Sequence, residues 1–269
     1  MGTIGNLTTS GNVYTANQGT INNYSGNNGS VLESSGYVEN ATNNNSYVAS
    51  SGYIGNYNGN SGSVLESSGY VENATNNSGY VGNAGYMANY SGTGTSVLEN
   101  WGNLENAAVA DNGVASNAGN ITNYSGSGNS FLQNFSNMTN TSLTDNTTTN
   151  NYANMSNVEM FAGNNDNAAI NNFQGANIDF LNMNVNSSDN TGFLTANNAG
   201  NVNYMFGHDH VDQPPVPPTS SDLITVNNFD TGTVGFGQFS TSGIGQVDIN
   251  NMGAWGTLNA SGNTNIWNF

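Results

Sequence analysis

Apolar residues and asparagines alternate in a short unit that recurs through the first half of the chain. The unit reads Gly-x-Φ-x-Asn, where Φ is apolar, and successive copies lie 16 or 17 residues apart. The apolar positions are Ile4, Ile21, Val38, Ile54, Val71, Met87, Leu104, Ile121, Met138 and Met155, and the asparagines are Asn6, Asn23, Asn40, Asn56, Asn73, Asn89, Asn106, Asn123, Asn140 and Asn157. Glycine begins the first eight copies, and Ser136 and Ala153 replace it in the last two. A fixed short period of this kind indicates a stacked-repeat fold.

A second apolar element follows the first in each unit, as in Val31-Leu32, Tyr47-Val48 and Val64-Leu65. Clusters of Gly, Asn and Ser separate the two elements, and such clusters are turn signals. Dense Gly and Asn disfavour helix, and no stretch shows the 3.6-residue helical period. The sequence therefore predicts an all-β fold, a β-solenoid in which each unit is strand, turn, strand, turn.

Side chains alternate faces along a strand. This predicts that Val38 and Asn40 share one face, with Tyr37, Glu39 and Ala41 on the other. Asparagine amides stacked at strand spacing can hydrogen-bond one to the next, at roughly 1 kcal/mol for each buried bond. We therefore expect the asparagines to form a structural ladder and the apolar positions to form a core column. The alternative is that each Asn supplies turn geometry near a strand end.

The sequence is compatible with two lengths for one coil of the solenoid. Residues Ser30–Asn44 are identical to Ser63–Asn77, a step of 33 residues, so one coil is either about 17 or about 33 residues long. A 33-residue coil would stack Glu39, Glu72 and Glu105 directly, about 4.8 Å apart and without a cation. A coil of about 17 residues, two of which form the duplicated unit, separates the glutamates and places each Tyr that follows a ladder Asn between small neighbours. The sequence favours this shorter coil.

The repeat becomes less regular further along the chain. We expect regular solenoid repeats over residues 1–160 and an irregular continuation over 161–211. The run Gln-Pro-Pro-Val-Pro-Pro marks a linker over 212–222, since such runs adopt extended polyproline conformations. Residues 223–269 form a small β-rich C-terminal segment, which we expect to act as a cap, a docking strand or a secretion signal.

Charge narrows the function classes. The 269 residues include no Lys or Arg and 17 acidic residues, for a formal charge of -17. Without cations the chain cannot neutralise phosphates, which argues against nucleic-acid binding.

No apolar run is long enough for a membrane span. The absence of Cys excludes disulfides and thiolate metal sites. No leader with a basic and an apolar region is visible, so we expect an extracellular or cell-surface protein, secreted without a cleaved N-terminal signal.

Few residues of the sequence are candidates for metal binding or catalysis. His208 and His210 are the two histidines and stand near Asp212, so the pair could ligate a transition metal or could simply lie at a loop tip. Glutamates such as Glu33 and Glu39 repeat with the fold and form an acidic stripe. That stripe could collect Ca²⁺, although no calcium-loop motif is present. We expect no catalytic residues, no enzyme activity and no cofactor beyond this Ca²⁺ option.

The Gly-x-Φ-x-Asn units resemble the repeats of bacterial β-solenoid surface and fibre proteins, of the curli and haemagglutinin-repeat kinds. The resemblance covers roughly residues 2–160 and is one of repeat style. It implies a self-assembling filament or matrix fibre whose partner is the protein itself, and the repeat starting at Gly2 suggests an uncapped edge for strand addition. The alternative is a binding module: an adhesin for cell-surface glycans through a column of Tyr37, Tyr53, Tyr70 and Tyr86, or an ice-binding face, which would need a regular Thr array.

Overall fold

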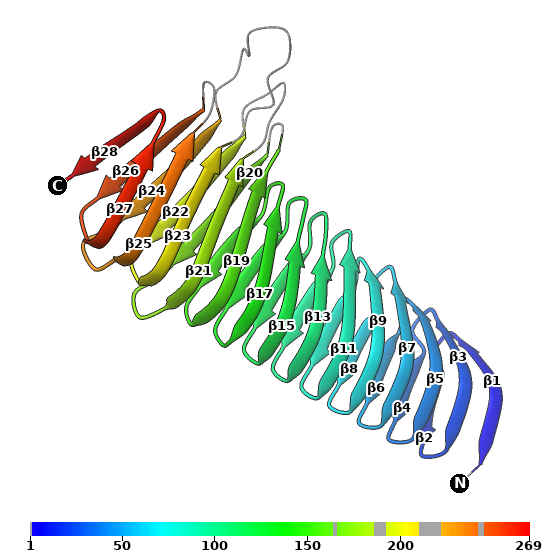
Figure 1. Cartoon of the computed structure of the whole chain (residues 1–269). Coiled ribbons are helices and arrows are strands. Elements are labelled where there is room, and N and C mark those ends of the chain that lie inside the picture. Colours follow the sequence, from blue (N-terminus) through cyan, green and yellow to red (C-terminus); the bar gives the residue numbers. More distant parts are fainter. Residues whose placement is uncertain (1, 164–165, 186–191, 210–221, 242–244) are drawn as a thin grey trace, which may run out of the picture. The chain divides into compact units, whose positions relative to one another are not determined.

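A computed structural model describes residues 2–163, 166–185, 192–209, 222–241 and 245–269 of the chain. The chain forms two compact units, Met1–Tyr124 and Ser125–Phe269. All regular structure in the described residues is β-strand. In both units, long and short strands alternate along the chain, long strands pair in parallel with long ones, and short strands pair in parallel with short ones (Figure 1). This is the predicted β-solenoid.

The long strands of the first unit are β1 (Thr3–Ser10), β3 (Thr20–Asn27), β5 (Tyr37–Asn44), β7 (Tyr53–Asn60), β9 (Tyr70–Asn77), β11 (Tyr86–Thr93), β13 (Asn103–Val109) and β15 (Asn120–Gly126). Its short strands are β2 (Tyr14–Asn17), β4 (Val31–Ser34), β6 (Tyr47–Ser50), β8 (Val64–Ser67), β10 (Tyr80–Asn83), β12 (Val97–Asn100) and β14 (Val114–Asn117). One long and one short strand with their two turns make one coil.

The strand register confirms the coil of about 17 residues. Val38 in β5 lies opposite Ile54 in β7, which in turn lies opposite Val71 in β9. In the next column, the bulky Tyr57 lies between Ala41 and Ala74. Small residues above and below each buried Tyr let one ring occupy the space of nearly two layers, so alternate large and small residues fill the core at interior density.

The predicted division of faces in the long strands is wrong. Val38 is buried as expected, but Ala41 and Asn43 are buried too, while Asn40 is half-exposed. The pairing register runs from Val38 to Asn40 and omits Glu39 between them. The strand bends at this residue, so the alternation shifts by one position, and the residue after each ladder Asn enters the core. The bend lets one long strand follow the curve of the coil.

The repeat requires glycine because the backbones of successive coils approach closely at this turn. A Cβ added at Gly69 would fall well inside contact distance of the Gly52 carbonyl oxygen, and Gly52 stands in the same relation to Gly36. In the same turns, Tyr70 N–H donates to the Gly52 carbonyl at 3.0 Å. These corners therefore stack so closely that no side chain fits between successive coils.

The second unit keeps the same plan, with longer coils between its first and its last. Its long strands are β17 (Met138–Thr144), β19 (Asn154–Ala162), β21 (Asn177–Val185), β23 (Asn201–Asp209), β25 (Thr233–Thr241) and β27 (Ala254–Ser261). Its short strands are β16 (Phe131–Asn134), β18 (Thr148–Asn151), β20 (Asn167–Asn172), β22 (Phe193–Asn198), β24 (Leu223–Asn228), β26 (Gln246–Asn251) and β28 (Thr264–Asn268). Equivalent asparagines lie 17, 21, 26, 30, 23 and 17 residues apart from Asn134 to Asn268.

Residues 223–269 join the same two sheets as the strands before them. Leu223 in β24 lies opposite Phe193 in β22, and Val234 in β25 lies opposite Val202 in β23. Most of the Pro-rich segment predicted as a linker, 212–221, lies outside the described residues. The last residue of the predicted linker, Asp222, is described and buried, and its Oδ1 accepts a hydrogen bond from the Gly192 N–H at 2.9 Å. The last segment is thus built into the sheets of the second unit.

Candidate functional site

The asparagines of the repeat form a hydrogen-bonded ladder on the outside of the first unit. Each side-chain amide donates to the Oδ1 of the asparagine one coil earlier, at 2.7–3.0 Å from Asn23 through Asn123. In the second unit, Asn157 donates to Asn140 at 3.0 Å, and the column continues as Phe180, Tyr204, Phe236 and Thr257. Because water competes for these exposed amides, each bond stabilises the fold less than a buried one.

The expected core column is buried except at its first residue. Ile21, Val38, Ile54, Val71, Met87, Leu104, Ile121, Met138 and Met155 are all buried, whereas Ile4 is 44% exposed. A core residue is covered by its own coil and by the coils on both sides. Ile4 has a paired strand, β3, on one side of β1, and this explains its exposure.

A second asparagine ladder runs inside the molecule at the ends of the short strands. In the first unit, Asn83 Nδ2 donates to Asn100 Oδ1 and Asn100 Nδ2 to Asn117 Oδ1, both at 2.9 Å. In the second unit it joins Asn134, Asn151, Asn172, Asn198, Asn228, Asn251 and Asn268, and its last bond, from Asn251 to Asn268, is exposed. This ladder was not predicted from the sequence. Its signal was the Asn or Ser at the end of each second apolar element, as in Val-Leu-Glu-Ser and Val-Leu-Glu-Asn.

The predicted tyrosine column stacks on the outer face of the long-strand sheet. Successive rings of Tyr37, Tyr53, Tyr70 and Tyr86 lie 4.8–5.3 Å apart and within 14° of parallel. Tyr53 donates to Glu72 at 2.6 Å, and this hydrogen bond, ahead of burial, raises the pKa of Tyr53 to about 12. The ring faces inside the column cover one another, so the column presents mainly ring edges to a ligand.

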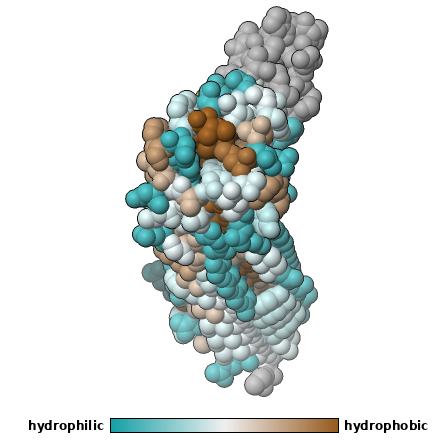
Figure 2. Space-filling model, turned by 60° about the vertical axis from the view of Figure 1, so that its left-hand side comes forward, coloured by the Kyte–Doolittle hydropathy of each residue, from teal (hydrophilic) through white to brown (hydrophobic). Residues whose placement is uncertain are grey.

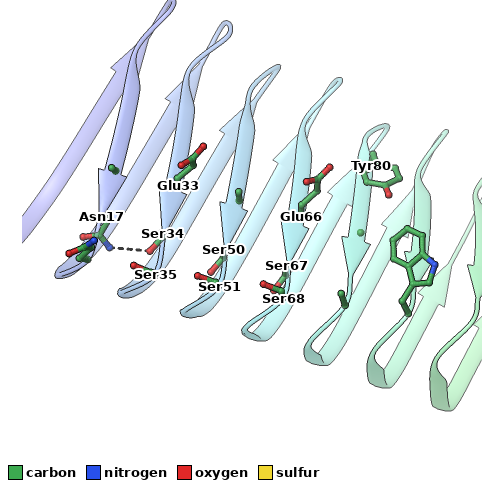
Figure 3. Close-up of a pocket in the computed structure, with 16 residues that line it drawn as sticks. Asn17, Glu33, Ser34, Ser35, Ser50, Ser51, Glu66, Ser67, Ser68 and Tyr80 are labelled. Carbon is green, nitrogen blue, oxygen red and sulfur yellow. Dashed lines mark hydrogen bonds between the residues drawn. The ribbon is translucent and has the colours of Figure 1, made fainter.

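A groove of about 670 Å³ lies on the first unit along the outer face of the short strands (Figure 3). Its floor alternates small residues with carboxylates, since Ala16, Glu33, Ala49, Glu66 and Gly82 occupy successive strands at the same position. Its wall includes a row of serines, Ser35, Ser51 and Ser68, and Tyr80 and Trp101 also line it. The glutamates were predicted from the sequence as an acidic stripe, whereas the hollows between them were not predicted.

Tyrosine hydroxyls hold the groove carboxylates in place. Tyr14 donates to Glu33 Oε2 at 2.5 Å and Tyr47 donates to Glu66 Oε2 at 2.7 Å, each from one coil earlier. The bond to Glu66 is the main cause, ahead of burial, that raises the pKa of Tyr47 to about 12. A carboxylate has about four lone-pair sites, so a single tyrosine leaves each glutamate with capacity to accept further hydrogen bonds.

The histidine pair is described only in part. His208 lies exposed in β23, with its Nδ1 at 2.7 Å from Ser240 Oγ. His210 and Asp212 lie outside the described residues. Within the described ranges, no three His, Cys, Asp or Glu side chains gather closely enough to hold a metal ion.

Comparison with protein-family models, curated proteins and solved structures gives no match. The geometry of the chain is therefore what bears on its function. No helix in the described part of the chain has the length and apolarity needed to cross a membrane.

Proposed function

We propose that this is a non-catalytic, extracellular structural protein whose copies join end to end into a filament or matrix fibre. The distribution of charge is the observation that carries the proposal. All 17 acidic residues lie between Glu33 and Asp248, so the first 32 and the last 21 residues carry no charged side chain. Acidic flanks repel one another when copies lie side by side, whereas the neutral ends can approach.

The two ends also offer what strand addition needs. Among the described residues, β1 and β2 stand at one edge of the two sheets, and β27 and β28 stand at the other. An edge strand presents unpaired N–H and C=O groups. Proteins commonly protect such edges with charged residues or proline, and none of these four strands contains either. Ile4 is 44% and Ile266 is 48% exposed. Figure 2 turns the C-terminal end of the second unit forward and shows hydrophobic side chains on its surface.

If the parallel strand register continues from one copy to the next, residues at the same repeat position meet at the junction. Trp255 and Leu258 in β27 hold the repeat positions that Ile4 and Leu7 hold in β1. On the short-strand side, Asn251 donates to Asn268 at 2.6 Å, and the next residue of that column would be Asn17 of the following copy. Each junction would bury apolar area, at about 25 cal/mol per Å², and would extend the inner ladder.

Electron microscopy of the purified chain tests this proposal. We expect filaments from the natural chain, and short or single particles from Ile4→Asp or Ile266→Asp, because each change places a charge at one end. Phe161→Asp is a matched control, since Phe161 is 43% exposed in β19, which is paired on both sides. Monodisperse particles of the natural chain, or filaments from both end variants, would refute end-to-end assembly.

The strand register at the junction between copies can be tested by disulfide cross-linking. The chain contains no cysteine, so only the introduced cysteines can react. Thr257 of one copy should lie opposite Asn6 of the next, about 4.8 Å away, within the Cα range of a disulfide. Mixing Thr257→Cys with Asn6→Cys under oxidation should give covalent dimers. Asn259→Cys mixed with Asn6→Cys, two residues out of register, should give few. Equal yields from the two mixtures would exclude this register.

A further inference from the structure

The groove on the short-strand face of the first unit has the features of a binding site for an extended chain. Its volume of about 670 Å³ falls within the range of ligand sites in proteins. Glu33 and Glu66 stand on the same face, two strands apart (Figure 3). Two strand separations put these carboxylates about 9.6 Å apart, so any ligand that contacts both in the same way must repeat at that distance.

Exposed polar side chains along the groove can pair with a ligand. Glu33 and Glu66 each accept one tyrosine hydroxyl through Oε2, at 2.5 and 2.7 Å, and both side chains are exposed. The wall serines Ser35, Ser51 and Ser68 are exposed and add further hydroxyls. The groove is therefore lined with donors and acceptors suited to a ligand rich in hydroxyl groups.

An aromatic surface is available as well. Trp101 is 55% exposed and lines the groove together with Tyr80. Indole and phenol rings offer large apolar faces with a polar handle, and the C–H face of a pyranose ring packs on such faces. Carboxylates accept paired hydrogen bonds from neighbouring sugar hydroxyls, and bonds to a charged acceptor are stronger than neutral ones. Anionic chains are disfavoured, because the glutamates would meet like charge and the protein has no cation.

We propose that this groove binds an extended, uncharged, β-1,4-linked polysaccharide, with one disaccharide for every two coils. Such a chain presents the same face at every second sugar, at a spacing close to that of the two carboxylates. Glu33 and Glu66 accept hydroxyl hydrogen bonds, the small residues Ala49 and Gly82 leave room for the rings, and Trp101 stacks on one sugar. The site lies on the side of the coils and is independent of end-to-end assembly.

Isothermal titration calorimetry of the full chain with cellohexaose tests the proposal. We expect binding of cellohexaose and none of maltohexaose, whose α-linkages curl the chain away from this repeat. Trp101→Ala should weaken binding about tenfold, and Glu66→Gln several-fold. Ala49→Trp should abolish binding by filling the groove. Glu72→Gln is the matched control, because Glu72 has the same tyrosine partnership on the other sheet.

Three results would overturn the proposal: no heat with cellohexaose, equal affinity for maltohexaose, or affinity unchanged by both Trp101→Ala and Ala49→Trp. A Lys-rich peptide titrated in parallel separates the competing class of ligand. Tight binding of that peptide, lost in Glu66→Gln and able to displace cellohexaose, would identify the groove as a site for cationic protein segments instead.

Discussion

Replacing one asparagine of the inner ladder should destabilise the first unit far more than replacing one of the outer ladder. Asn100 is 1% exposed, accepts from Asn83, and donates to Asn117 and to the Gly102 carbonyl at 3.1 Å. Asn100→Ala removes the two amide–amide bonds, at about 1 kcal/mol each. The buried Asn83 amide then keeps only the longer contacts to the Gly85 and Asn103 carbonyls, at 3.4 and 3.3 Å, at a further cost of about 1 kcal/mol. We expect a total loss near 3 kcal/mol.

The matched variant is Asn89→Ala. Asn89 also makes two amide–amide bonds, to Asn73 at 2.9 Å and from Asn106 at 2.8 Å, but it is exposed. Water can replace the lost partners, so we expect a loss below about 1 kcal/mol. Asn100→Ser should fall between the two, since serine occupies the same column at Ser34, Ser50 and Ser67.

Urea unfolding of the three variants measures these differences. Repeat proteins can unfold in parts, so circular dichroism and tryptophan fluorescence should both be recorded, and free energies compared where the two transitions coincide. A loss from Asn89→Ala as large as that from Asn100→Ala would refute the reasoning, because it would show that burial does not decide the strength of a ladder.

Two further predictions concern the corners and the buried tyrosines. Gly69→Ala should destabilise the fold by about 1–3 kcal/mol through overpacking, while Gly5→Ala, where an added Cβ meets nothing within 4 Å, should be nearly neutral in the same urea assay. Alkaline pH should destabilise the fold: burial raises the pKa of Tyr57 to about 12, so unfolded chains lose this proton from about pH 10 while folded ones retain it. The stabilisation from the raised Tyr57 pKa is therefore complete below pH 10 and is lost between pH 10 and 12. Tyr57→Phe should reduce the fall of the unfolding free energy with pH in this window. An unchanged fall would contradict the assignment to Tyr57.

The register of the solenoid could be predicted because each coil is paired with a near copy of itself. The spacing of the ladder asparagines and the Tyr–Ala alternation at 57 and 74 were enough to favour the 17-residue coil. Asn40 and Ala41 show the limit of this reasoning. Strict alternation put Ala41 outside, whereas the bend at Glu39 turns it into the core, and a bend needed to close a coil leaves no distinct local pattern.

The sequence by itself determined the period, the all-β class, the outer ladder and the chain's uncharged ends, because each of these is a property of residue type and spacing. Tertiary structure decided which side chains are buried. It placed the Asn100 ladder inside and the Asn89 ladder outside, although both have the same spacing and chemistry. It also brought Glu33, Glu66 and Trp101 to one groove, since residues 33 or 35 positions apart become neighbours only when the chain has coiled twice.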